Sequence, residues 1–107
     1  MNLLRLIIKD MIKLKIKFKD GHRYSFRGEV IEFKYGYICL KNIRDQADNI
    51  VKDYFKFYEP DMVAEKNMKI GDTIAFDARV KARDGIVSDL DNVTKIKLVK
   101  KESEEIF

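Results

Sequence analysis

The 107-residue chain contains no tryptophan and only one cysteine, one proline and one histidine. A single cysteine, Cys39, excludes an internal disulfide and favours a reducing compartment. With His22 as the only histidine, the chain has no His/Cys cluster for zinc and no Ser/His/Asp set for nucleophilic catalysis. It also lacks a glycine-rich loop leading into a helix. We therefore expect a protein that is not an enzyme and that needs no metal or cofactor.

Long apolar runs are also missing. The opening stretch "MNLLRLIIKDM" is too short and too interrupted to span a membrane, and it lacks the small-residue cleavage site of a secretory signal. We therefore expect a cytoplasmic protein. Leu3, Leu4, Ile7 and Ile8 share a helical stripe. This segment either packs on the domain, joins two subunits in a homo-oligomer, or is an upstream extension if translation starts at Met11.

The composition is that of one globular domain, with 46% hydrophobic and 37% charged residues. The net charge of +4 is only a weak pointer to polyanionic partners. How the charges are distributed along the chain therefore matters more than their sum.

Alternating apolar and polar residues predict a mainly β protein. Gly28 stands where a bulge would bend a long strand and reset its faces. The alternation places Ile38, Leu40, Ile74, Phe76, Ala78, Val80, Ile96 and Leu98 in the core. The expected strands are 12–19, 23–33, 37–43, 51–58, 73–83 and 93–101, with a short helix within 60–68 and a loop over 84–92. Met62, Val63 and Met68 of the helical region would cap the end of a barrel.

The order of elements from Arg23 onward is three strands, a short helix and two strands, with a long bent first strand and a Gly-Asp turn in "MKIGDTIAFDARV". These features resemble the OB-fold, a five-stranded Greek-key barrel with a helix between strands three and four. The resemblance covers residues 12–100, and another small barrel, such as an SH3-like one, is the alternative. It implies an N-terminal extension at 1–11, an extra N-terminal strand before the barrel, and a tail at 101–107.

A narrower resemblance is carried by "GYICLKNI", "IVKDYFKF" and "GDTIAFDARV", which are similar to small OB-type proteins of bacterial phages and mobile elements. In that pattern the aspartate is followed by histidine and then, one residue on, by a large aromatic. Here Tyr54 holds the histidine position and Lys56 the aromatic one, so Tyr58 is the candidate for a second stacking side chain.

The stretch "VKDYFKFYEP" places cations and phenols alternately on one face of the strand expected over 51–58. This strand is the third strand of the OB-type barrel. Single-stranded nucleic acid needs flat side chains for base stacking and cations for phosphates, and the OB-fold binds oligonucleotides on its second and third strands. Tyrosine and lysine are, however, also common on exposed strand faces. The candidate nucleic-acid-binding residues are Lys34, Tyr35, Tyr37, Lys41, Lys52, Tyr54, Lys56, Tyr58, Arg79, Lys81 and Arg83.

Two charge patterns complicate this interpretation. Asp84, Asp89 and Asp91 fall in the expected loop, where a nucleic-acid clamp would prefer cations, and their spacing fits no calcium loop. The lysines at every second position of 13–19 either follow a phosphate backbone or protect an edge strand from aggregation.

The last residues, "KKESEEIF", place two aromatic or aliphatic residues after a run of acids. They resemble the acidic tail of bacterial single-stranded-DNA-binding proteins, whose terminal phenylalanine docks on replication and repair enzymes. This chain lacks the proline of that tail, has glutamates for aspartates and has no long linker, and an ordinary frayed terminus is the alternative. The resemblance implies partner binding through Glu104, Glu105, Ile106 and Phe107.

The sequence thus favours single-stranded DNA binding in replication or repair, with a replication or repair enzyme as partner through the tail. RNA binding, and a protein-interaction module such as an inhibitor or accessory subunit, remain the alternatives.

Overall fold

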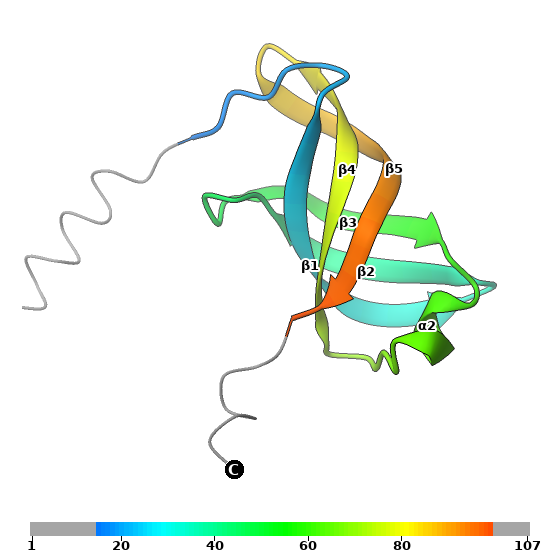
Figure 1. Ribbon diagram of the computed structural model, residues 1–107. Helices are drawn as coiled ribbons and strands as arrows, with labels where there is room; N and C mark the ends of the chain where they lie inside the picture. The colour runs from blue at the N-terminus through cyan, green and yellow to red at the C-terminus, as the bar shows by residue number, and fades with distance from the viewer. Residues whose placement is uncertain (1–14, 100–107) are drawn as a thin grey trace, which may run out of the picture.

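The computed structural model describes residues 15–99, which form one curled antiparallel sheet shaped like half a barrel (Figure 1). The strand order across the sheet is β3-β2-β1-β4-β5, and one short helix lies between β3 and β4 in the chain. The mainly β class and the predicted order of elements from Arg23 onward are confirmed. The elements are β1 (Arg23–Lys34), β2 (Tyr37–Arg44), β3 (Ile50–Tyr58), α2 (Met62–Glu65), β4 (Thr73–Arg83) and β5 (Ile86–Leu98).

The long strand β1 makes the sheet curl, because it pairs with β4 along its first half and with β2 along its second half. Its register with β2 shifts twice, between Arg27 and Glu29 and again between Val30 and Glu32. The predicted irregularity at Gly28 is therefore present. A Cβ at Gly28 would lie 2.8 Å from Cδ1 of Ile43 and 3.2 Å from Cβ of Leu40, so these two buried side chains would have to shift to admit a larger residue.

Two tight hairpins join β1 to β2 and β4 to β5. The central residues of both have positive φ angles: 52° and 81° for Tyr35 and Gly36, 54° and 79° for Asp84 and Gly85. Positive φ at both central residues is typical of type I′ turns, whose twist matches that of the flanking strands.

The loop predicted over 84–92 is wrong, because β5 already begins at Ile86. Of the three aspartates that suggested a loop, Asp89 and Asp91 belong to this strand, whereas Asp84 lies in the turn before it. Asp89 forms an ion pair with Lys52, and Asp91 forms one with Arg79, so basic side chains on other strands offset the charge of both aspartates.

The core lies inside the curl and is built from alternate residues of all five strands. The predicted inward residues Ile74, Phe76, Ala78 and Val80 are all buried. Rings from β1, β3 and β4 meet there: Phe76 lies about 6 Å from Phe26, Phe55 and Phe57, measured between ring centroids. Ile38, Leu40 and Ile96 are buried as predicted, and Leu98 is half-buried.

The helix α2 is one turn long, shorter than the predicted range of 60–68. Asp61 makes no side-chain capping bond at its start, and Asn67 adopts a φ of 51° that ends the helical path. Met68 is nevertheless buried, and Met62 and Val63 pack against the core, as predicted for residues that cap its end. No helix within residues 15–99 is long and apolar enough to cross a membrane.

The extra strand predicted over 12–19 is wrong for residues 15–19, which belong to no strand; residues 12–14 lie outside the described range. The segment runs past the β4–β5 hairpin and makes one backbone hydrogen bond there, from Phe18 N to Gly85 O (3.0 Å). It is held by packing instead. The buried ring of Phe18 lies 4.8 Å from that of Tyr24, and the lysines on either side of it point to solvent.

Candidate nucleic-acid interface

Strands β2 and β3 place tyrosines and lysines side by side on the outer face of the sheet. The register pairs Tyr37 with Tyr58, and Lys41 with Tyr54, so these side chains lie directly opposite each other. The intervening Ile38, Leu40, Phe55 and Phe57 are buried in the core. The alternation that the sequence predicts for β3 is therefore present from Tyr54 to Tyr58, whereas Asp53, predicted on the inward face, is exposed.

A shallow cleft of about 380 Å³ lies on this outer face, beside the β1–β2 hairpin. We call it the tyrosine cleft. Five of its seven lining residues are among those predicted from the sequence, and they come from β1, β2, β3 and the hairpin. The lining residues are Glu32, Lys34, Tyr35, Tyr37, Cys39, Tyr54 and Lys56.

The rings of the tyrosine cleft are accessible but held in place. Tyr35 is 85% exposed and Tyr54 47%. Tyr58, at the rim, is 60% exposed and its ring meets that of Tyr37 edge to face, with centroids 5.3 Å apart. Gly36 makes room for this arrangement, because a Cβ there would lie 2.6 Å from Cε1 of Tyr58.

Two lysines of the cleft lie over aromatic rings. The Nζ of Lys56 is 4.9 Å from the centroid of Tyr37, and that of Lys34 is 5.6 Å from the centroid of Tyr35. Neither lysine forms an ion pair within residues 15–99. Both cations therefore stay close to the rings and remain open to an anionic ligand.

The other two predicted lysines of β2 and β3 are already paired. Lys41 Nζ lies 3.8 Å from Glu29 Oε1, and Lys52 Nζ lies 3.7 Å from Asp89 Oδ1. The sequence prediction did not include these partners, which halve the free positive charge of the face. A polyanion that binds here has to compete with two carboxylates.

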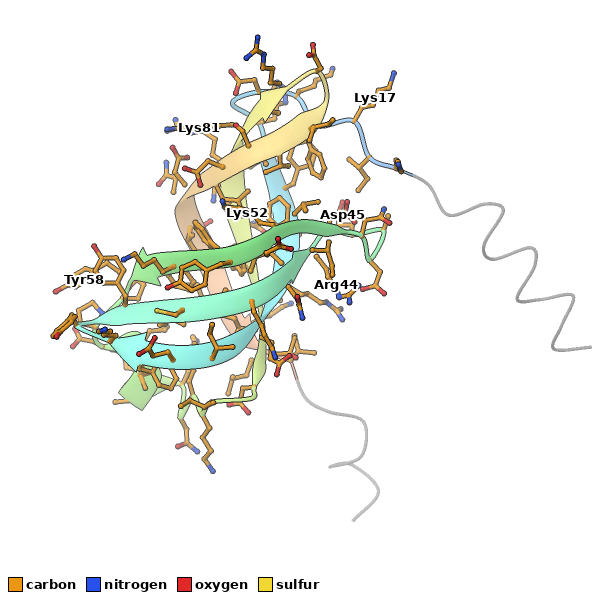
Figure 2. All side chains as sticks on the ribbon, turned by 180° about the vertical axis from the view of Figure 1, so that it is seen from behind. Lys17, Arg44, Asp45, Lys52, Tyr58 and Lys81 are labelled. Atoms are coloured by element: carbon orange, nitrogen blue, oxygen red, sulfur yellow. The ribbon has the colours of Figure 1, made fainter. Side chains whose placement is uncertain are left out.

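The row Arg79, Lys81 and Arg83 on β4 does not line the tyrosine cleft. In Figure 2, Lys81 lies well away from Tyr58. Arg79 donates two hydrogen bonds to the Asp91 carboxylate, of 2.9 and 3.0 Å, which raises the pKa of Arg79 and lowers that of Asp91. Lys81 and Arg83 make no ion pair within the described residues.

Cys39 and Glu32 belong to the cleft and were not predicted. Cys39 is 3% exposed yet is absent from the core cluster, because its side chain points outward and is covered by its neighbours in the cleft. Its hydrogen bond with Tyr54, followed by partial desolvation and the nearby Glu32 carboxylate, raises the pKa of the Tyr54 phenol. The position of Cys39 between Tyr37 and Lys41 in the alternation was the signal that placed it on this face.

A larger hollow, of about 560 Å³, lies elsewhere, against β1, β4, β5 and the β2–β3 loop. Its charged lining mixes both signs and includes Arg27, Lys95 and Lys97 together with Asp45 and Asp48. The aromatic residues that border it, Phe26 and Phe76, are buried. It therefore offers cations without exposed rings for stacking.

The tail residues Glu104, Glu105, Ile106 and Phe107 lie outside the described residues. Within residues 15–99, no group of three or more His, Cys, Asp or Glu side chains is placed to hold a metal ion. Comparison of the chain with protein-family models, with curated proteins and with solved structures found no match. The proposals below therefore rest on the geometry of the chain itself.

Proposed function

We propose that this protein binds single-stranded nucleic acid, DNA in the first place, on the outer face of an OB-type barrel. The strand order β3-β2-β1-β4-β5, the helix between β3 and β4 and the long bent β1 support the OB assignment. In such a barrel the outer face of β2 and β3 is the surface that binds oligonucleotides. The tyrosine cleft occupies that surface.

The observation that carries the proposal is that exposed rings in and beside the tyrosine cleft lie next to two lysines that form no ion pair within residues 15–99. Tyr35, Tyr54 and Tyr58 offer ring faces on which bases stack, at about 1–3 kcal/mol per base. Lys34 and Lys56 lie beside rings, where they would contact the phosphates between stacked bases.

Duplex DNA does not fit this arrangement, since its bases are already stacked on one another and present only their edges in the grooves. The phenol of Tyr54 is neutral at physiological pH, because its pKa lies above the already alkaline ordinary value of a tyrosine, so the ring does not repel phosphates. The proposed ligand is accordingly an unpaired strand that lies across β2 and β3.

Fluorescence anisotropy with labelled dT oligomers, single-stranded and duplex, across a salt series tests the proposal. We expect binding of the single strand that weakens steeply with salt, and much weaker binding of the duplex. The ring faces and lysines do not read the sugar, so the same series with labelled U oligomers is needed to compare RNA with DNA. The absence of dT binding at low salt would refute the proposal.

Two observations favour a second candidate, a protein-interaction surface. Glu32 lines the cleft, and the ion pairs of Lys41 and Lys52 reduce the positive charge of β2 and β3 around it. A protein partner that carries charges of both signs complements such a surface better than a polyanion does. In that case the oligomers would not bind, and an inhibitor or accessory-subunit role would take the place of strand binding.

We further propose that the C-terminal tail binds a protein partner. Its acidic residues followed by Ile106 and Phe107 support docking on a replication or repair enzyme. The tail would recruit that enzyme to the strand held on the barrel.

A further inference from the structure

A second cleft, of about 390 Å³, lies at the opposite end of β3 from Tyr58. It is lined mainly by apolar side chains from the segment before β1, the start of β3 and the β4–β5 hairpin. Two isoleucines in it are unusually accessible, Ile50 at 47% and Ile86 at 71%. We call it the isoleucine cleft. Its lining residues are Lys15, Ile16, Phe18, Asp45, Asn49, Ile50, Val51, Gly85, Ile86 and Val87.

Clustered exposed apolar side chains mark a surface that another group covers. Ile50 and Ile86 come from different elements and meet in one hollow, with Val51 and Val87 half-buried beside them. The β4–β5 turn itself needs only Asp84 and Gly85, so its geometry does not account for an isoleucine directly after it. The cleft therefore needs an apolar occupant.

The chain itself carries a suitable occupant next to the cleft. The described residues begin at Lys15, which lines the cleft, and Lys17 lies against the β4–β5 hairpin (Figure 2), where its Cβ is 3.5 Å from the position of a Cβ at Gly85. The 14 residues that precede Lys15 therefore start at the wall of the cleft and need no linker to reach it. Leu3, Leu4, Ile7, Ile8 and Met11 recur there at helical spacing.

We propose that residues 1–14 bind the isoleucine cleft of the same molecule through this apolar stripe. Attachment at Lys15 gives the segment a high effective concentration at the cleft, which favours its own chain over a second copy. The polar residues Asn2, Arg5 and Lys9 fall on the opposite side of the same helical projection and would face solvent.

This docking site is separate from the proposed strand-binding surface. Ile50 and Tyr58 stand at the two ends of β3, and eight residue steps of about 3.3 Å place them about 26 Å apart. Substitutions in the isoleucine cleft should therefore leave dT affinity unchanged. This makes failure of the docking proposal distinguishable from failure of strand binding.

Thermal unfolding of full-length variants tests the proposal. Ile86→Lys is compared with Ile70→Lys, because Ile70 is 68% exposed and does not line the cleft. If residues 1–14 cover Ile86, Ile86→Lys should lower Tm by about 4–8 °C more than Ile70→Lys does, the shift that a loss of about 1 kcal/mol causes in a domain of this size. Equal shifts in the two variants would overturn the proposal.

A second comparison identifies the occupant. Ile7→Lys should lower Tm in a similar way, whereas Asn2→Lys, which adds the same charge on the polar side, should have little effect. In the double variant Ile7→Lys/Ile86→Lys, Tm should fall by much less than the sum of the two single decreases, because both substitutions remove the same contact. Additive losses would refute contact between the segment and the cleft.

Sedimentation velocity over a range of concentrations completes the test. Docking within one molecule predicts a monomer at all concentrations. A concentration-dependent dimer that Ile86→Lys dissociates would overturn the intramolecular form and assign the cleft to the segment of a second copy.

Discussion

Replacement of Gly36 by alanine tests how the β1–β2 hairpin holds the Tyr58 ring over the tyrosine cleft. Gly36 has a φ of 81°, and a Cβ there would lie 2.6 Å from Cε1 of Tyr58, so the ring has to move. The left-handed backbone alone costs an alanine about 1–2 kcal/mol. If Tyr58 stacks on a base, its displacement should weaken binding by a further 1–3 kcal/mol, about 5- to 150-fold.

Gly85→Ala supplies a matched control. Gly85 has a φ of 79° in the equivalent position of the β4–β5 hairpin, and its added Cβ would meet only Lys17, at ordinary contact distances of 3.5 Å and more. Both variants should therefore lose a similar stability from the backbone, about 4–8 °C in Tm for each kcal/mol. Only Gly36→Ala should also lose affinity for dT oligomers, measured by anisotropy at a temperature where both variants are folded. Equal affinity of the two variants would refute the stacking role of Tyr58.

Three further predictions concern charge. Lys56→Ala should reduce the slope of log affinity against log salt by about 1, whereas Lys41→Ala, whose amine is already paired with a carboxylate, should reduce it less; equal slopes would contradict the distinction. The lowered pKa of Asp91 means that its stabilising effect is present above its ordinary value of 3.8 and is lost as pH falls through the lower folded-state pKa. Asp91→Asn should accordingly lower Tm at neutral pH, and the difference from wild type should vanish in strong acid; a difference that persists there would argue against the ion pair. Deletion of Ile106 and Phe107 should leave dT affinity within about twofold, since it removes none of the rings or cations of the tyrosine cleft. It should also abolish recovery, in a pull-down, of the replication or repair enzyme encoded beside this gene; equal recovery would make the tail an ordinary terminus.

The strands could be predicted from sequence wherever one face is buried, because a period of two is then visible in the residues themselves. The alternation over Ile74 to Val80 and over Phe55 and Phe57 therefore placed these side chains correctly. It also placed Tyr37 and Tyr54 on the outer face together. These features depend on local pattern alone.

The failures share a cause, which is that they depend on partners on other strands, and the local pattern does not show these partners. Asp89 and Asp91 suggested a loop, yet β5 tolerates them because Lys52 and Arg79 lie opposite on other strands. The Asp-Gly pair at 84–85 was the local signal of a tight hairpin, and the carboxylates that follow obscured it.

The N-terminal strand was overpredicted for a related reason. Alternating lysines satisfy the pattern of a strand, but a strand also needs a neighbouring edge that donates and accepts a ladder of hydrogen bonds. Residues 15–19 meet the β4–β5 hairpin at its tip, where Phe18 forms one backbone bond with Gly85. The sequence does not reveal which edges are accessible.

The candidate site was predicted in its residue types and only partly in its charge. The pairing of Lys41 with Glu29 depends on the register of β1 against β2, which two irregularities shift. Such shifts alter which side chains face each other without changing the alternation along either strand.

The most direct test of the central claim is an amide chemical-shift titration of the ¹⁵N-labelled protein with a dT oligomer at low salt. The account predicts shifts concentrated in β2, β3 and the Tyr35–Gly36 turn, with little change at Ile50 and Ile86. Shifts centred on Arg27, Lys95 and Lys97, or no shifts at all, would contradict it.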